Sequence, residues 1–255
     1  MADNPPCRIA LVTAAGGGAG RVIATRLRAA GYAVLALDID AAGLSALPPE
    51  IATLAGDAGD EAHIAEAMAL LRARFGRLDL LVNNVGIAGP TAPAEAVTLA
   101  DWNATLRANL TAHFLAARGA IPLLRAAGGG AIVNISSASA KVGLPLRLPY
   151  VVSKAAVLSL TTNLARELGP EGIRVNAILP GAIEGERLRR VITSKAAALG
   201  VSAEDYERDL LRYISLRSTV TPDDIAETIL FLAGPGGRKI TGQCIGVDGN
   251  LEYEA

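Results

Sequence analysis

The stretch Thr13-Ala14-Ala15-Gly16-Gly17-Gly18-Ala19-Gly20 decides the fold. It follows a short apolar run at 8–12 and precedes a segment, 22–30, in which apolar residues recur at helical spacing. This order predicts a strand, a glycine-rich turn and a helix. Glycines at such a turn let a phosphate group approach the backbone amides, and the positive end of the helix dipole favours a pyrophosphate there.

A carboxylate follows the next predicted strand. The apolar run 33–37 ends at Asp38, about 20 residues beyond the glycines, where a carboxylate can accept hydrogen bonds from both hydroxyls of an adenosine ribose. The same charge would repel a 2′-phosphate, so Asp38 favours NAD over NADP. The alternative is that Asp38 is an ordinary polar end of a strand.

Strands and helices alternate along the rest of the chain. Further apolar strands are expected at 51–54, 78–82, 131–135, 174–179 and 243–247, and helices at 61–75, 101–126, 150–168 and 222–233. Seven strands joined by crossover helices predict an α/β fold, a doubly wound and mostly parallel sheet with helices on both faces. No linker interrupts 1–255, so we expect one domain, with the charged helical insertion 184–215 as a lid over its site.

Polar residues stand where these strands end, and ligands of open α/β sheets bind at that edge. Asp57 follows the third strand at a level where an adenine could lie, and Asn83-Asn84-Val85-Gly86 follows the fourth. Ser136-Ser137 ends the fifth strand. Asn109 lies inside a predicted helix among leucines, where an amide side chain invites a functional reason.

Tyr150 and Lys154 are four residues apart on a predicted helix. Positions i and i+4 lie on the same helix face, so the phenol and the ammonium can act together. A free phenol is a poor base at neutral pH, with a pKa of about 10, but a nearby cation favours the phenolate. A tyrosine in that setting can move a proton in either direction near pH 7.

Composition excludes several classes of function. The formal net charge is −1 over 255 residues, so the chain lacks the excess of basic residues that binding to nucleic acid or an anionic membrane requires. The two cysteines, Cys7 and Cys244, fit no metal-ligand spacing, and we expect no metal site. Neither a signal peptide nor a run of about 18 apolar residues is evident, so we expect a cytoplasmic protein without a membrane span.

Taken together, these motifs resemble those of the short-chain dehydrogenase/reductase family over nearly the whole chain. The family's TGxxxGxG corresponds to residues 13–20, its NNAG to 83–86, its YxxxK to Tyr150 and Lys154, and its PG to Pro180-Gly181. The resemblance implies a Rossmann fold and hydride transfer between NAD(H) and a secondary alcohol or ketone. It also implies that Ser137, 13 residues before the tyrosine, is the catalytic serine, and that Asn109 is the active-site asparagine.

The family's mechanism assigns roles to these residues. Tyr150 moves the proton, Ser137 stabilises the charge on the substrate oxygen, Lys154 supports the phenolate and bonds the nicotinamide ribose, and Asn109 holds a water that links Lys154 to solvent. The resemblance places the cofactor against Thr13, Ala15, Gly18, Ala19, Gly20, Asp38, Asp57, Ala58, Asn84, Gly86, Tyr150, Lys154 and Ile183.

Three positions depart from the family pattern. Ala14 replaces the first motif glycine, which predicts an altered turn, and Val85 replaces the alanine of NNAG, which is a packing change. Gly185 stands where the family often has a threonine near the nicotinamide carboxamide. The backbone of Ile183 is therefore the expected carboxamide partner.

The substrate is less well defined by the sequence. We expect a small polar hydroxy compound, because the loop 144–148 carries Arg147 and the lid carries Glu184, Glu186, Arg187, Arg189 and Arg190. These arginines would favour an anionic one such as a sugar acid or a hydroxy acid, unless they are solvated or pair between subunits. Val142, Leu144 and Leu146 would suit a 3-oxoacyl or steroid ketone instead.

Two other classes of function use the same fold. A dehalogenase-like lyase replaces the lysine and abandons the dinucleotide loop, and a non-catalytic NAD sensor loses a catalytic residue; this chain does neither. The resemblance further implies a homotetramer or a homodimer, with interfaces on the helices at 101–126 and 150–168 and on the last strand.

Overall fold

The computed structural model describes residues 7–252, apart from the side chains of Arg187, Ser194, Lys195 and Ala198. Its centre is a sheet in the order β3-β2-β1-β4-β5-β6-β7, in which all neighbouring strands are parallel. The strands are β1 Arg8–Thr13, β2 Tyr32–Asp38, β3 Ala52–Ala55, β4 Leu80–Asn83, β5 Gly130–Ile135, β6 Ile173–Pro180 and β7 Cys244–Val247. The seven-stranded doubly wound sheet is therefore confirmed.

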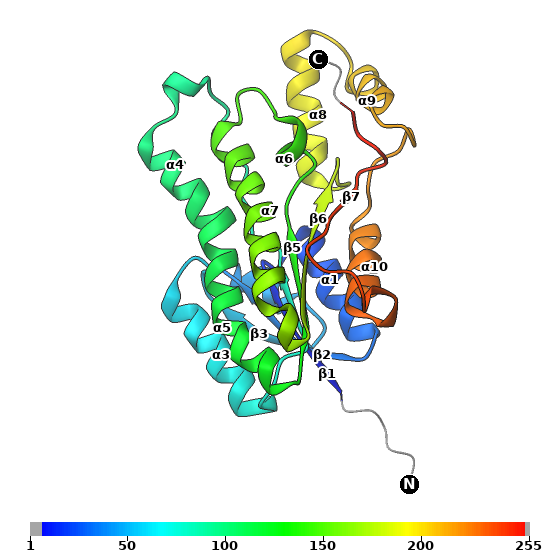
Figure 1. The fold of residues 1–255 in the computed structure, drawn as a ribbon. Helices are drawn as coiled ribbons and strands as arrows, with labels where there is room; N and C mark the ends of the chain where they lie inside the picture. The colour runs from blue at the N-terminus through cyan, green and yellow to red at the C-terminus, as the bar shows by residue number, and fades with distance from the viewer. Residues whose placement is uncertain (1–6, 253–255) are drawn as a thin grey trace.

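Helices cover both faces of this sheet (Figure 1). One face packs against α3 Glu61–Phe75, α5 Ala112–Ala126 and α7 Leu148–Leu168, and the other against α1 Gly18–Ala29, α2 Ala41–Ser45 and α10 Pro222–Ala233. Each face has its own cluster of fully buried aliphatic side chains, such as Leu11 and Leu81 on the first and Val12 and Val82 on the second. Alternate residues of one strand thus serve both cores, which explains why the strands are near-continuous apolar runs.

The strand order reverses direction between β1 and β4. β2 and β3 lie on one side of β1, whereas β4 to β7 follow on the other. Loops leaving the carboxyl ends of β1 and β4 therefore diverge to opposite faces and leave a crevice, the usual ligand position in open parallel sheets. The helices of the predicted lid, α8 Glu186–Leu199 and α9 Ala203–Arg212, lie beyond this edge, as Figure 1 shows.

The predicted helix 101–126 is interrupted by a π-helical turn, which the sequence pattern does not indicate. α4 Leu99–Leu106 continues into a π-helical turn, Arg107–Thr111, before α5 begins. A π-turn adds one residue to a helical turn and is frequent at functional sites. Here it holds Asn109, whose side chain is fully buried.

The part of the chain that the structure describes has no helix long and apolar enough to cross a membrane. Within the same residues no cluster of three or more metal-ligating side chains is found. Cys7 and Cys244 are free thiols.

Candidate active site

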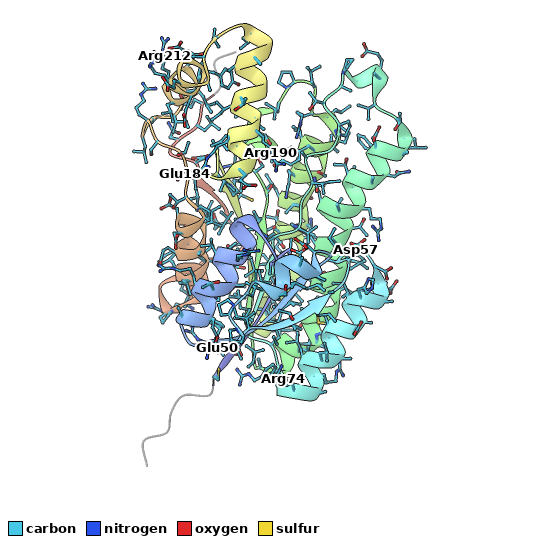
Figure 2. The ribbon with its side chains drawn as sticks, turned by 180° about the vertical axis from the view of Figure 1, so that it is seen from behind. Glu50, Asp57, Arg74, Glu184, Arg190 and Arg212 are labelled. Atoms are coloured by element: carbon cyan, nitrogen blue, oxygen red, sulfur yellow. The ribbon has the colours of Figure 1, made fainter. Side chains whose placement is uncertain are left out.

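A cavity of about 790 Å³ opens at the carboxyl edge of the sheet, between the glycine-rich loop, the ends of β4, β5 and β6, helix α7 and the lid. Figure 2 shows the lid residues Glu184 and Arg190 at this end of the molecule, with Glu50 and Arg74 at the opposite end. Ten of the predicted site residues line the cavity: Gly18, Ala19, Gly20, Asp38, Asn84, Gly86, Ser137, Tyr150, Lys154 and Ile183. The other five, Thr13, Ala15, Asp57, Ala58 and Asn109, lie behind its wall or outside it.

The glycine-rich loop leaves its own main chain accessible to a ligand. Gly18 has a φ of +48°, in the left-handed region that favours glycine. A Cβ at Gly20 would lie 1.9 Å from the carbonyl oxygen of Ala14, so a side chain cannot fit there. Ala14, which stands where the family pattern has a glycine, has a φ of +52° and so places a non-glycine residue in the left-handed region.

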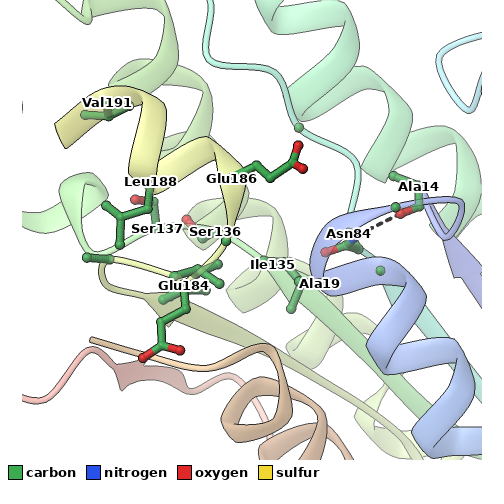
Figure 3. A pocket seen from close by; sticks show the side chains of 18 of the residues that line it. Ala14, Ala19, Asn84, Ile135, Ser136, Ser137, Glu184, Glu186, Leu188 and Val191 are labelled. Carbon is green, nitrogen blue, oxygen red and sulfur yellow. Dashed lines mark hydrogen bonds between the residues drawn. The ribbon is translucent and has the colours of Figure 1, made fainter. Parts of the chain in front are cut away.

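Thr13 and Asn84 join the two loops of the crevice. The main-chain N–H of Asn84 donates to Thr13 Oγ1 at 3.0 Å, and Thr13 Oγ1 donates to the carbonyl of Val82 at 3.4 Å. Asn84 Nδ2 donates to the carbonyl of Ala14 at 3.0 Å (Figure 3). These bonds fix the glycine loop against the end of β4, and buried Thr13 acts on the cavity through them.

Tyr150, Lys154 and Ser137 converge on the cavity from α7 and from the end of β5. Lys154 is 3% exposed, and its Nζ donates to the carbonyl of Ile135 at 2.9 Å. The hydroxyl of Ser137 lies 2.9 Å from that of Ser139. The neighbouring Ser136 instead donates to the carbonyl of Lys154 at 2.7 Å, so its hydroxyl is committed to holding α7.

Asn109 supports this group from behind. Its Oδ1 accepts from Ile87 N at 2.7 Å, while its Nδ2 donates to Ile87 O and to Ser153 Oγ, both at 3.0 Å. Both amide hydrogens are therefore used, and the predicted role in holding a water stays a prediction. A Cβ at the intervening Gly86 would lie 3.0 Å from Lys154 Nζ, so this glycine lets the ammonium reach the loop.

Asp57 and Ala58 lie at the outer end of the crevice. Asp57 Oδ2 accepts from Arg107 Nη1 at 2.7 Å, and Ala58 is 4% exposed. Partial burial acts to raise the pKa of Asp57, but the N–H of Gly59 and the guanidinium of Arg107 outweigh it and lower that pKa. Contact of these residues with a cofactor stays a prediction.

The segment after Pro180-Gly181 presents its main chain to the cavity. The N–H of Val220 donates to the carbonyl of Ala182 at 2.9 Å, and the carbonyl of Val220 accepts from the N–H of Glu184 at 2.8 Å. Peptide groups alternate in direction along an extended segment, so the N–H and C=O of Ile183 point away from Val220. Since Ile183 lines the cavity, its main chain is placed to bond a polar group there.

The residues present fit a dinucleotide. The loop excludes side chains where a pyrophosphate would lie, the N-terminus of α1 faces the same space, and Asp38 stands at the end of β2 with its carboxylate on the cavity. Tyr150, Lys154 and Ser137 line the same cavity.

Comparison with known proteins decides the family. A family model described as enoyl-(acyl carrier protein) reductase matches residues 14–251. D-threitol dehydrogenase of Mycolicibacterium smegmatis is 36% identical over 251 residues, covering 95% of this chain and 92% of the relative. The chain belongs to the short-chain dehydrogenase/reductase family. It is thus an oxidoreductase that acts on alcohol and ketone groups.

Other members share both length and fold with this enzyme. 2-(R)-hydroxypropyl-CoM dehydrogenase of Xanthobacter autotrophicus is 32% identical, covering 95% of this chain and 97% of the relative. A crystal structure of NAD+-bound xylitol dehydrogenase superposes with a TM-score of 0.88 at 27% identity, covering 95% of this chain and 98% of the other. The Rossmann fold predicted from the motifs is confirmed.

The structure adds one residue to the site that sequence reasoning missed. His113 is fully buried on α5, one helical turn after Asn109, and its Nε2 lies 3.1 Å from the carbonyl of Val85 in the loop that contains Gly86. Burial, followed by the charge of Lys154, lowers the pKa of His113 to about 3. The imidazole is therefore neutral, and as an Nε2–H donor it holds the loop beside the lysine. The spacing of four residues from Asn109 was the available signal.

This histidine makes stability depend on pH. Above about pH 6.5 His113 is neutral in both the folded and the unfolded chain. As the pH falls further, the unfolded chain takes up a proton that the folded chain does not bind until about pH 3. We therefore expect the free energy of unfolding to fall by about 2 kcal/mol through this residue when the pH is lowered from 7 to 5.

Urea unfolding at the two pH values measures this effect. The variant His113→Gln, which keeps an amide donor for Val85, should lose that part of the pH dependence. His63→Gln removes the other histidine of the chain and should retain it. An equal fall in wild type and His113→Gln would contradict the expectation.

Proposed function

We propose that this enzyme transfers a hydride between NAD(H) and a small polar secondary alcohol or its ketone. The observation that carries the proposal is that one cavity is lined both by Asp38, at the end of β2, and by Ser137, Tyr150 and Lys154. When bound, nicotinamide supplies the hydride acceptor for alcohol oxidation and the hydride donor for ketone reduction.

The side chains then have separate tasks. Tyr150 as a phenolate accepts the hydroxyl proton during oxidation, and as a phenol it returns that proton during reduction. The Ser137 hydroxyl donates to the substrate oxygen and stabilises its developing charge. Lys154 is held in a buried position by the Ile135 carbonyl, and its ammonium supplies positive charge on the cavity that Tyr150 also lines. Ile183 offers its main chain to the carboxamide.

Preference for NAD is supported by the carboxylate of Asp38. A 2′-phosphate beside this group would bring two anions together, whereas a ribose diol offers it two donors. Replacing Asp38 with Ala should raise KM for NAD by about tenfold or more, because hydrogen bonds to a charged acceptor contribute about 1.5–3 kcal/mol each. KM for NADP should fall in the same variant.

Initial rates measured by NADH or NADPH absorbance with both cofactors check this expectation. Glu50→Ala, at the opposite end of the molecule, is the control for loss of a carboxylate as such (Figure 2). An unchanged ratio of kcat/KM for NAD over NADP in Asp38→Ala would contradict NAD specificity.

A polyol-like substrate is supported by relatives and by the walls of the cavity. Relatives of this chain include a D-threitol dehydrogenase and, among structures, a xylitol dehydrogenase. The lid contributes Glu186 and Arg190 together with Leu188 and Val191, so the substrate end is mixed rather than apolar. Figure 3 shows Glu186, Leu188 and Val191 on the lid side, across from the glycine loop.

An anionic hydroxy acid is the second candidate, and one contact favours it. The guanidinium of Arg147 lies 5.7 Å from the centre of the Tyr150 ring, and its Nη1 donates to Thr91 Oγ1 at 2.8 Å. Arg190 lines the cavity, whereas the side chain of Arg187, named with Arg147 from the sequence, lies outside the described residues. A rate screen of tetritols, pentitols, hydroxy acids, 3-oxoacyl thioesters and hydroxysteroids separates all of these classes.

We also propose a cytoplasmic homotetramer or homodimer. Leu99 on α4 is 73% exposed and Phe114 on α5 is 45% exposed, and large apolar side chains at such positions are typical of an association surface. Sedimentation velocity measures the assembly, and a monomer at micromolar concentration would contradict it.

A further inference from the structure

A closed circuit of hydrogen bonds lies beneath Asp38. Gly16 N donates to Asp38 Oδ2 at 2.7 Å, and Asp40 N donates to Asp38 Oδ1 at 3.0 Å. Gly43 N in turn donates to Asp40 Oδ1 at 2.9 Å. Arg21 closes the circuit, because its Nε and Nη2 donate to Gly16 O while Nη2 also reaches Gly43 O at 3.3 Å.

This circuit fixes the plane of the Asp38 carboxylate. Each of its oxygens accepts one main-chain N–H, from Gly16 on one side and from Asp40 on the other. A carboxylate oxygen can accept two hydrogen bonds, so each retains one lone pair. Asp38 lines the cavity, so we expect the two remaining lone pairs to be available there to the two hydroxyls of a vicinal diol.

Two glycines of this circuit have no space for a side chain. A Cβ at Gly43 would lie 2.6 Å from both Asp40 Oδ2 and Gly16 O. A Cβ at Gly16 would lie 3.1 Å from Asp38 Oδ2. Both glycines are therefore needed for the carbonyls and the carboxylates to approach one another.

Arg21 joins the two halves of this circuit without touching the ligand space. It lies in the first turn of α1 but is not among the cavity-lining residues. Its guanidinium donates to two neutral carbonyls, and within residues 7–252 it forms no ion pair. Its planar guanidinium can bridge two acceptors at once, which a lysine ammonium does less rigidly.

We propose that Arg21 is a positioning residue for cofactor recognition: by joining Gly16 to Gly43 it holds Asp38 oriented toward the adenosine ribose diol. The inference rests on the proposed NAD specificity and deepens it. Arg21 thereby contributes to the choice of NAD over NADP through Asp38, and not by contact with the cofactor.

The first test is kinetic. Arg21→Met keeps the aliphatic stem and removes the guanidinium, and it should raise KM for NAD about tenfold while kcat at saturating NAD stays within about twofold. Arg28→Met, on the exposed side of the same helix, is the matched control and should leave both constants unchanged. An unchanged KM in Arg21→Met would overturn the proposal.

A double-mutant cycle with Asp38→Ala separates positioning from direct contact. If Arg21 acts through Asp38, Arg21→Met should change KM for NAD by less than about twofold in the Asp38→Ala background. A tenfold effect that persists there would overturn the proposal, because it would mean that Arg21 contacts the cofactor or supports the loop in general.

Gly43→Ala tests the same circuit from its other end, outside the cavity. It should reproduce the rise in KM for NAD and the lower NAD/NADP ratio of kcat/KM, and wild-type values would overturn the proposal. The unchanged kcat also guards against misfolding, which would lower kcat in proportion to the folded fraction. If Asp38→Ala leaves KM for NAD unchanged, the proposed NAD specificity fails. If Asp38→Ala raises KM for NAD but Arg21→Met and Gly43→Ala do not, the NAD specificity stands and the role of Arg21 fails.

Discussion

Replacing Tyr150 with Phe should lower kcat by about a thousandfold, since a positioned acid or base contributes about 10²–10⁴ to the rate. The substitution removes only the hydroxyl and keeps the ring, which stacks near Arg147. Ser137 and Lys154 share the cavity with Tyr150, but in the proposed mechanism they stabilise charge and do not move the substrate proton. Turnover should therefore fail at the proton-transfer step while the fold is retained.

Binding measurements separate a chemical defect from a structural one. The dissociation constant for NADH, from fluorescence titration of Tyr150→Phe, should stay within about threefold of wild type. Tyr206→Phe, on lid helix α9, serves as the control and should keep its kcat. Substantial turnover by Tyr150→Phe with normal NADH binding would show that another group moves the proton.

The fold could be predicted because its signals are local. Near-continuous apolar runs mark the buried parallel strands, and the ends of helices carry their own chemistry. Asp60, for example, caps the start of α3, where its side chain accepts from Ala62 N at 2.8 Å. The π-turn Arg107–Thr111 gives no such signal, because it depends on the contacts that Asn109 makes with Ile87 and Ser153.

Ten of the residues named from the sequence line one cavity, but the sequence does not indicate which of their polar atoms already have partners. Tyr150, Lys154 and Ser137 line one cavity as their spacing and family motif imply. Which polar atoms are already used is a matter of long-range geometry: Asp57 pairs with Arg107, fifty residues away in sequence. No pattern in the sequence reports such a pairing.

His113 and Arg21 are absent from the predicted site for the same reason. A histidine on an apolar helix and an arginine after a glycine loop each have an unremarkable local setting. Their contacts depend on the fold. It brings the carbonyl of Val85 to His113, and it brings the carbonyls of Gly16 and Gly43 to Arg21.

Gly20→Ala should be the most damaging single-methyl change in the glycine-rich loop. The added Cβ would lie 1.9 Å from Ala14 O and 2.7 Å from Asn84 Nδ2, well inside van der Waals contact. Both atoms belong to the hydrogen bond that joins the glycine loop to the end of β4. We expect a loss of stability of about 1–3 kcal/mol, the usual cost of overpacking.

Cofactor binding should suffer more than stability, because relief of the clash must move the loop on which a pyrophosphate would lie. A rise in KM for NAD of about a hundredfold corresponds to a loss of roughly 2.7 kcal/mol of binding free energy. Gly17→Ala supplies the stability control: no atom lies within 4 Å of its Cβ, and its φ of −154° is open to any residue. Thermal unfolding of the two variants should therefore diverge, whereas NADH titration compares Gly20→Ala with wild type. Wild-type stability and wild-type NADH binding in Gly20→Ala would mean that the loop can shift to accommodate a methyl group against the Ala14 carbonyl.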